Sequence, residues 1–141
     1  MRLFIDTNVV LDVLLARKPY LQPAAQLLSL VDTGRIEGIV SATTVTTIHY
    51  IAAKAVGRGP AAQHLRTLLA LFEVASVDRE VLLSALDLDF PDYEDAVLHE
   101  AARASAAAAI VTRNGADFGK ATLPVFTPQE LLAAVTASSL R

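Results

Sequence analysis

Leu3-Phe4-Ile5-Asp6-Thr7-Asn8, near the start of the chain, is the stretch that decides the fold. Its three apolar residues predict a short strand buried on both faces, as in a parallel sheet covered by helices. Asp6, Thr7 and Asn8 follow at the carboxyl end of that strand, where open α/β sheets bind their ligands. One of them can cap the next helix, expected over residues 9–16, but one cap does not account for three polar residues in a row. We therefore expect Asp6 to be an ionised carboxylate in a cleft, with a cation as its partner.

The length, cysteine content and net charge of the chain limit the classes of protein to which it can belong. The chain has 141 residues, enough for one domain with its own core, and we expect a single domain over residues 1–141. It has no cysteine, which excludes disulfides, thiolate zinc sites and cysteine nucleophiles. No stretch is apolar enough for a membrane span and no signal peptide opens the chain, so we expect a cytoplasmic protein with no membrane association. A net charge of −3 leaves nucleic-acid binding to a metal or a local basic patch.

Strand-like and helix-like segments alternate along the whole chain, which predicts a parallel sheet between two layers of helices, a three-layer α/β/α fold. Gly34 is expected to end a helix, Ser41 to cap the next one, and Thr127-Pro128-Gln129-Glu130 to open the last. Residues 57–60 are expected to be a break. The expected strands are 3–5, 36–40, 72–77, 109–112 and 125–126, and the expected helices are 9–16, 21–31, 42–55, 61–71, 79–86, 92–107 and one from residue 128.

Acidic residues gather at two further places. Asp92, Glu94 and Asp95 open a helix, where free N–H groups and the helix dipole stabilise one acid but gain little from a third. Asp92 and Asp95 also have the spacing of a capping box. Asp117 follows the strand that ends near Thr112, and it could simply cap a short turn. Together with Asp6, these acids make an oxygen-rich site that suits Mg²⁺ or Mn²⁺, and the absence of a nucleophile points to metal-activated water.

In these motifs the chain resembles the PIN-domain ribonucleases and, among them, the VapC-type toxins of toxin–antitoxin pairs. The resemblance rests on the opening strand with Asp6-Thr7-Asn8, on Tyr93-Glu94-Asp95-Ala96 heading a helix, and on Ile110-Val111-Thr112-Arg113-Asn114 leading to Asp117. It spans nearly the whole chain and implies a small parallel sheet flanked by helices, with Mg²⁺ or Mn²⁺ held by carboxylates. Asp6 and Asp95 match acids of the family motif, and Thr112 matches its hydroxyl residue.

Two positions depart from the family pattern. Thr47 stands where the family usually has a glutamate, and Asn114 stands where an acid often follows the last threonine. A threonine brings no negative charge, although it can bind a metal-bound water through its hydroxyl group. We expect Asp117 to replace the acid missing at Asn114, and Glu94 or Asp92 to supply a further carboxylate.

The resemblance implies a metal-dependent endoribonuclease that is a homodimer and is held inactive by a small antitoxin protein. In this hypothesis Asp6, Asp95 and Asp117 hold the metal, Glu94 completes the catalytic set, and Asn8 and Thr112 orient the aspartates. The alternative is a catalytically impaired module that binds RNA or a protein partner. Arg113 with Lys120 and the basic residues 17–18, 54 and 58 could contact phosphates, or they could be ordinary surface charges.

Overall fold

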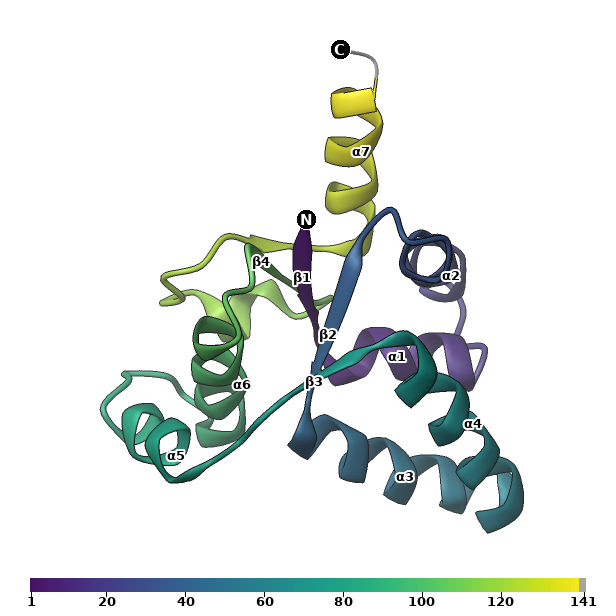
Figure 1. The fold of residues 1–141 in the computed structure, drawn as a ribbon, viewed down its shortest axis with the longest axis horizontal. Coiled ribbons are helices and arrows are strands. Elements are labelled where there is room, and N and C mark those ends of the chain that lie inside the picture. The colour runs from purple at the N-terminus through teal and green to yellow at the C-terminus, as the bar shows by residue number, and fades with distance from the viewer. Residues whose placement is uncertain (140–141) are drawn as a thin grey trace.

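The computed structural model describes residues 1–139, and in that part of the chain five parallel strands form one sheet with helices on both faces (Figure 1). The strands are β1 (Arg2–Ile5), β2 (Glu37–Ser41), β3 (Glu73–Ala75), β4 (Ala109–Val111) and β5 (Val125–Phe126). The helices are α1 (Thr7–Leu14), α2 (Leu21–Asp32), α3 (Ala42–Val56), α4 (Arg58–Leu71), α5 (Arg79–Leu86), α6 (Tyr93–Ala104), a 3-10 helix η1 (Gly115–Phe118) and α7 (Pro128–Ser139). The predicted fold class is confirmed.

The strand order places the opening strand at the centre of the sheet. The order is β3-β2-β1-β4-β5, and every neighbouring pair is parallel. In β1, Leu3 lies opposite Gly38 of β2 on one side and Ala109 of β4 on the other. Because parallel strands end at the same edge, the residues that follow β1, β2 and β4 lie next to one another at the carboxyl edge of the sheet.

Two apolar clusters cover the two faces of the sheet, because successive side chains of a strand point to opposite sides. Leu3, Ile5 and Val111 belong to the cluster that also contains side chains of α1, α2, α3, α4 and α7. Phe4 and Ile110 belong to the second cluster, with side chains of α5 and α6. Figure 1 shows the same division, with α5 and α6 on one side of the sheet and α1, α3 and α4 on the other.

Most expected helix and strand ends lie within two residues of the observed ones, and three of the differences have a clear physical cause. The first helix begins at Thr7 rather than Val9, because the Asp6 carboxylate caps it. The fourth begins at Arg58 rather than Ala61, inside the expected break: Gly57, with a φ of 92°, precedes it, and Pro60 lies in the first turn, where no N–H is needed. The sixth ends at Ala104 rather than Ala107, because Ala106 adopts a φ of 59° and the chain turns into β4.

The expected helix caps at Ser41 and Thr127 are confirmed. The Ser41 hydroxyl accepts a hydrogen bond from the Thr43 N–H, and Thr127 and Glu130 bond each other's N–H groups in a capping box. The second residue of β2 is a glycine for a packing reason, because a Cβ atom at Gly38 would lie 2.6 Å from the ring of Phe72. No helix within residues 1–139 is both long and apolar enough to cross a membrane.

Candidate metal centre

Asp6 is held in place by the strand on which it ends and by the neighbouring strand. Its N–H donates to the Val111 carbonyl at 2.9 Å, which continues the pairing of β1 with β4 by one residue. Its carboxylate is 7% exposed, with Oδ1 accepting from the Thr7 N–H at 2.7 Å and Oδ2 accepting from the Thr112 hydroxyl at 2.7 Å. The Asn8 amide lies 3.3 Å from the same Oδ2. Asp6 is therefore a fixed carboxylate with a defined orientation.

The surroundings of Asp6 act on its pKa in opposite directions. Burial raises the pKa most, because it penalises the charged form. The hydrogen bonds from Thr112 and Thr7 lower it, and the negative charges of Glu94 and Asp117 raise it again. The net shift of the Asp6 pKa is upward, so the surroundings disfavour the charged carboxylate. A cation bound nearby would favour the charged form instead.

Asp95 lies in the first turn of α6 and faces the same negative field. Burial is the largest cause that raises its pKa, to about 7, and the charge of Asp6 is the next. Asp92, Asp117 and Glu94 add to the effect. Among residues 1–139 no lysine or arginine forms an ion pair with Asp6, Asp95, Glu94 or Asp117. The acidic group is thus a negative patch that lacks a direct ion pair, and the charge of Arg113 acts on Asp6 only without contact.

The other residues singled out in the sequence have different surroundings. Glu94 and Asp117 are exposed, and they act on Asp6 and Asp95 through their charge. Asp92 caps α6, since its Oδ1 accepts from the Glu94 N–H at 2.7 Å, and no return bond from Asp95 completes a capping box in the described residues.

The two positions that depart from the family pattern contribute differently. Asn114 acts through its backbone, whose N–H donates to the Thr112 hydroxyl at 3.0 Å. Thr47 is half-buried in α3. The hydroxyl of α3 that contacts the start of α1 belongs to Thr44, 3.0 Å from the Thr7 hydroxyl. The run of threonines in α3 indicates a hydroxyl contact at this place, but the sequence alone does not show which threonine faces the start of α1.

The donor chemistry fits Mg²⁺ or Mn²⁺, which prefer carboxylate oxygens. Within residues 1–139 no three acidic or histidine side chains are grouped closely enough to hold an ion by themselves. In a magnesium site, one or two carboxylates can bind the ion directly while water molecules complete its shell. Asp6 and Asp95 are the pair that the electrostatics favour for direct binding.

Sequence reasoning missed a buried ion pair beside the candidate metal centre. Asp12, only 1% exposed, accepts from Arg113 at 2.7 Å (Nε) and 3.1 Å (Nη2). The Arg113 guanidinium was expected at a basic rim or on the open surface, and instead it pairs with Asp12 and lies 4.0 Å from the Tyr20 ring centroid. The sequence does contain an indication of this ion pair, because Asp12 is the one charged residue in the otherwise apolar stretch 9–14. The other rim residue, Lys120, pairs with Asp89.

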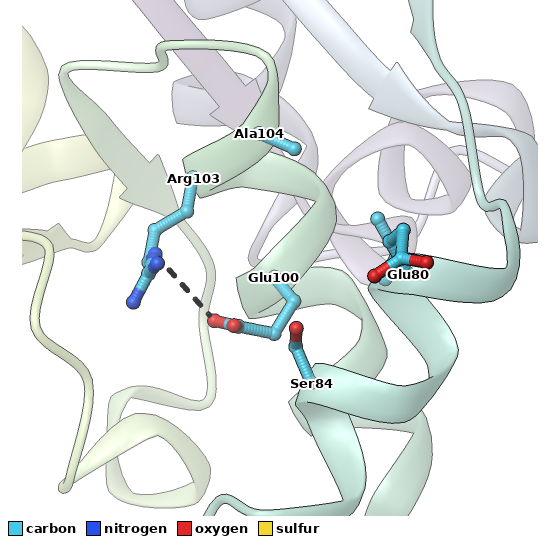
Figure 2. A pocket seen from close by; sticks show the side chains of 6 residues that line it. Glu80, Ser84, Glu100, Arg103 and Ala104 are labelled. Atoms are coloured by element: carbon cyan, nitrogen blue, oxygen red, sulfur yellow. Dashed lines mark ion pairs between the residues drawn. The ribbon is translucent and has the colours of Figure 1, made fainter.

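A second buried polar network lies further along α6. The Thr122 N–H donates to His99 Nε2 at 3.1 Å, so that nitrogen is an acceptor and Nδ1 donates to Glu100 at 2.9 Å. Glu100, with Arg103 3.8 Å away, also lines a cavity of about 160 Å³ between α5 and α6 (Figure 2). The network ties the segment that follows η1 to α6; η1 carries Asp117, and α6 carries Asp95.

The comparisons with known proteins establish the family. A family model described as PIN domain matches residues 2–116, and the chain belongs to the PIN domain family. No curated protein matches the chain by sequence.

Solved structures share the fold, among them one described as a toxin–antitoxin complex and one described as a toxin. FitAcB from Neisseria gonorrhoeae aligns with a TM-score of 0.70 at 20% identity, covering 90% of this chain and 98% of its own. A toxin–antitoxin complex from Klebsiella pneumoniae aligns with 0.68 at 23% identity, covering 89% and 96%. VapC20 of Mycobacterium tuberculosis, described as a toxin that cleaves the sarcin–ricin loop, aligns with 0.68 at 16% identity, covering 86% and 95%.

Proposed function

We propose that this protein is a metal-dependent endoribonuclease. The observation that carries the proposal is the orientation of Asp6 by Thr112 inside a negative patch that has no internal cation. Such a patch is costly for the fold alone and becomes favourable when a divalent cation binds. Membership of the PIN domain family supports this use of the site.

Asp6 and Asp95 would hold Mg²⁺ or Mn²⁺, with Asp117 and Glu94 acting directly or through water. When bound, the metal supplies a water of lowered pKa and neutralises charge on the phosphate oxygens. Thr112 and Asn8 keep the Asp6 carboxylate turned toward the site by their hydrogen bonds to Oδ2. Asp95, with a pKa near 7, stays partly protonated until a cation displaces its proton.

The direct test is cleavage of single-stranded RNA with Mg²⁺ or Mn²⁺ by the wild type and by Asp6→Asn. We expect metal-dependent cleavage that falls by at least 100-fold in Asp6→Asn, because the amide cannot carry the charge that binds the ion. Asp32→Asn is the matched control, since Asp32 is an exposed acid at the far end of α2. Equal cleavage by wild type and Asp6→Asn would refute the assignment.

The alternative function is an RNA- or protein-binding module without cleavage, and the uncharged Thr47 is the observation that favours it. It predicts that RNA binds in the presence of Mn²⁺ but stays intact. Thr47→Glu distinguishes the two: if the site is merely short of one acid, this change creates or increases cleavage. A wild type that cleaves RNA would remove the alternative.

We further propose that the protein is the toxin of a toxin–antitoxin pair, acting in the cytoplasm on cellular RNA. The likeness to toxins crystallised with their antitoxins supports a small antitoxin partner. Expression of the wild type alone should arrest growth, and Asp6→Asn should not. Harmless expression of an active nuclease would contradict the toxin role while leaving the chemistry intact.

A homodimer is the proposed assembly. Leu82, Leu83 and Leu86 of α5 and Tyr93 of α6 are exposed, and Leu86 is 66% exposed, which leaves an apolar surface that a second copy would cover. Light scattering coupled to size exclusion should give twice the chain mass. Leu86→Lys should shift the protein toward the monomer if this surface is used.

A further inference from the structure

A cavity lies beside the candidate metal centre, on the other side of the Thr112-Arg113-Asn114 segment. Its volume is about 290 Å³, and it is more enclosed than a surface groove. Three proline rings, one aromatic ring and two polar side chains make most of its lining: Pro19, Pro23, Pro128, Tyr20, Gln129 and Arg113. It therefore combines flat apolar walls with hydrogen-bonding groups.

Arg113 joins this cavity to the acid site. Its backbone N–H lies 3.4 Å from the Asn8 side-chain oxygen, and its guanidinium binds Asp12 one helical turn later on α1. The residue before it, Thr112, bonds Asp6. A nucleotide chain that crosses Asp6 would therefore have a neighbouring nucleotide within reach of the cavity.

The polar groups of the cavity keep capacity to bind a ligand. Asp12 occupies Nε and Nη2 of Arg113, and no hydrogen bond within residues 1–139 occupies Nη1. The Gln129 amide is exposed and makes no hydrogen bond to the described residues. Tyr20 is 43% exposed, and the Arg113 guanidinium fixes its ring at 4.0 Å. An aromatic ring already held in place stacks on a base with little loss of side-chain freedom.

We propose that this cavity binds the base of a nucleotide next to the cleaved phosphate, stacked on the face of the Tyr20 ring that Arg113 leaves free and hydrogen-bonded through Gln129. This rests on the proposed ribonuclease function and names its specificity subsite. The Gln129 amide offers both a donor and an acceptor to the edge of such a base. Single-stranded RNA is commonly read in this way, by stacking and by the edges of splayed bases.

The first test uses the four free nucleosides as probes, followed by NMR on the wild-type protein without metal. Nucleosides carry no phosphate and cannot be cleaved, so the result does not depend on the proposed activity. We expect one nucleoside to shift the resonances of Tyr20 and Gln129 at concentrations at least threefold lower than the others. Tyr20→Ala should abolish those shifts. Tyr50→Ala is the matched control, because Tyr50 is also an exposed tyrosine under a cation, Lys54 at 4.4 Å.

The second test measures which bases flank the cleavage sites in a random RNA pool. Tyr20→Ala and Gln129→Ala should cleave with the metal dependence of the wild type while losing at least fivefold preference at one flanking position. Tyr50→Ala should keep that preference.

The results of these tests separate the two proposals. Cleavage with an unchanged preference in Tyr20→Ala, or nucleosides that shift nothing in the cavity, would overturn the inference and leave the ribonuclease function standing. Perturbation of Tyr20 by an antitoxin but by no nucleoside would also overturn it, since the cavity would then be a protein-docking site.

Discussion

The hydroxyl group of Thr112 is the residue-scale feature on which the candidate metal centre depends. It donates to Asp6 Oδ2 at 2.7 Å and accepts from the Asn114 N–H at 3.0 Å. The hydroxyl group therefore acts as a donor toward the carboxylate and as an acceptor toward the loop that follows β4. The group is fully buried, so no water can replace these bonds without a rearrangement.

Replacing Thr112 by valine should test this dependence. Thr112→Val keeps the shape but removes the shortest hydrogen bond to Asp6 Oδ2, which keeps only the Asn8 amide at 3.3 Å, and it removes the acceptor of the Asn114 N–H. The change should destabilise the fold by about 1–3 kcal/mol. It should also raise the pKa of Asp6, because the Thr112 bond lowers that pKa. We expect weaker metal binding, measured by calorimetry at pH 7. Thr112→Ser restores the hydroxyl and should bind metal like the wild type; equal affinity in Thr112→Val would contradict the role of the bond.

The raised pKa of Asp95 gives a prediction for the metal-free protein. The pKa is about 7 in the folded chain and about 3.9 when unfolded, so between these values the native state holds a proton that the unfolded chain releases. The contribution of Asp95 therefore lowers stability as pH rises from about 4 to about 7. Urea unfolding in a chelator should show this decline in the wild type and a smaller one in Asp95→Asn. Parallel pH profiles would show that Asp95 ionises freely in the fold.

At the scale of elements, the Asp12–Arg113 pair fastens α1 to the segment after β4. Asn8 and Asp12 lie one turn apart on α1, and both contact Arg113, one at the backbone and one at the side chain. The helix and the loop that carry the residues around Asp6 are thus joined at two points. Because Asp12 is only 1% exposed, its charge depends on this partner.

Removing Arg113 alone should cost more than removing the pair. Arg113→Ala leaves a buried carboxylate with only Arg17, 4.0 Å away, and should destabilise the fold by about 3–5 kcal/mol. Asp12→Leu combined with Arg113→Met removes both charges and should cost much less. The free energy of unfolding in urea measures both variants. A double variant as unstable as Arg113→Ala would show that packing, rather than charge, decides the effect.

How much the sequence could predict depends on how local each signal is. Ser41 and Thr127 were identified as caps because a cap involves only the next three residues. The start of α4 was missed because Pro60 looks like a helix breaker unless it lies in the first turn, and the sequence alone does not show where that turn begins.

In the candidate site, too, local signals could be predicted from the sequence and contacts between distant residues could not. Asp6 and Thr112 could be placed together because each ends a strand and parallel strands end at one edge. The Asp12–Arg113 pair joins residues 101 positions apart and follows no periodicity, so it needed the structure. The same holds for His99 and Thr122.

At the scale of the whole molecule, the proposed metal site predicts that stability depends on divalent cations. A metal that binds the folded chain at 100 times its Kd adds about 2.7 kcal/mol to stability. We expect Mg²⁺ or Mn²⁺ to raise the Tm by several degrees, and Asp6→Asn to lose most of that rise. Asp32→Asn should keep it. Ca²⁺ at equal ionic strength separates specific binding from screening, and an equal Tm rise in Asp6→Asn would point to a different metal site.

The central position of β1 also bears on synthesis. Asp6 is made more than 100 residues before β4 and Thr112, which complete its surroundings. Until then one side of β1 has no partner, and Asp6 has no hydroxyl to orient it. Domains fold as units during translation, so a chain that ends before β4 cannot assemble the acid site. Any activity of the proposed site would therefore arise only after β4 has been made.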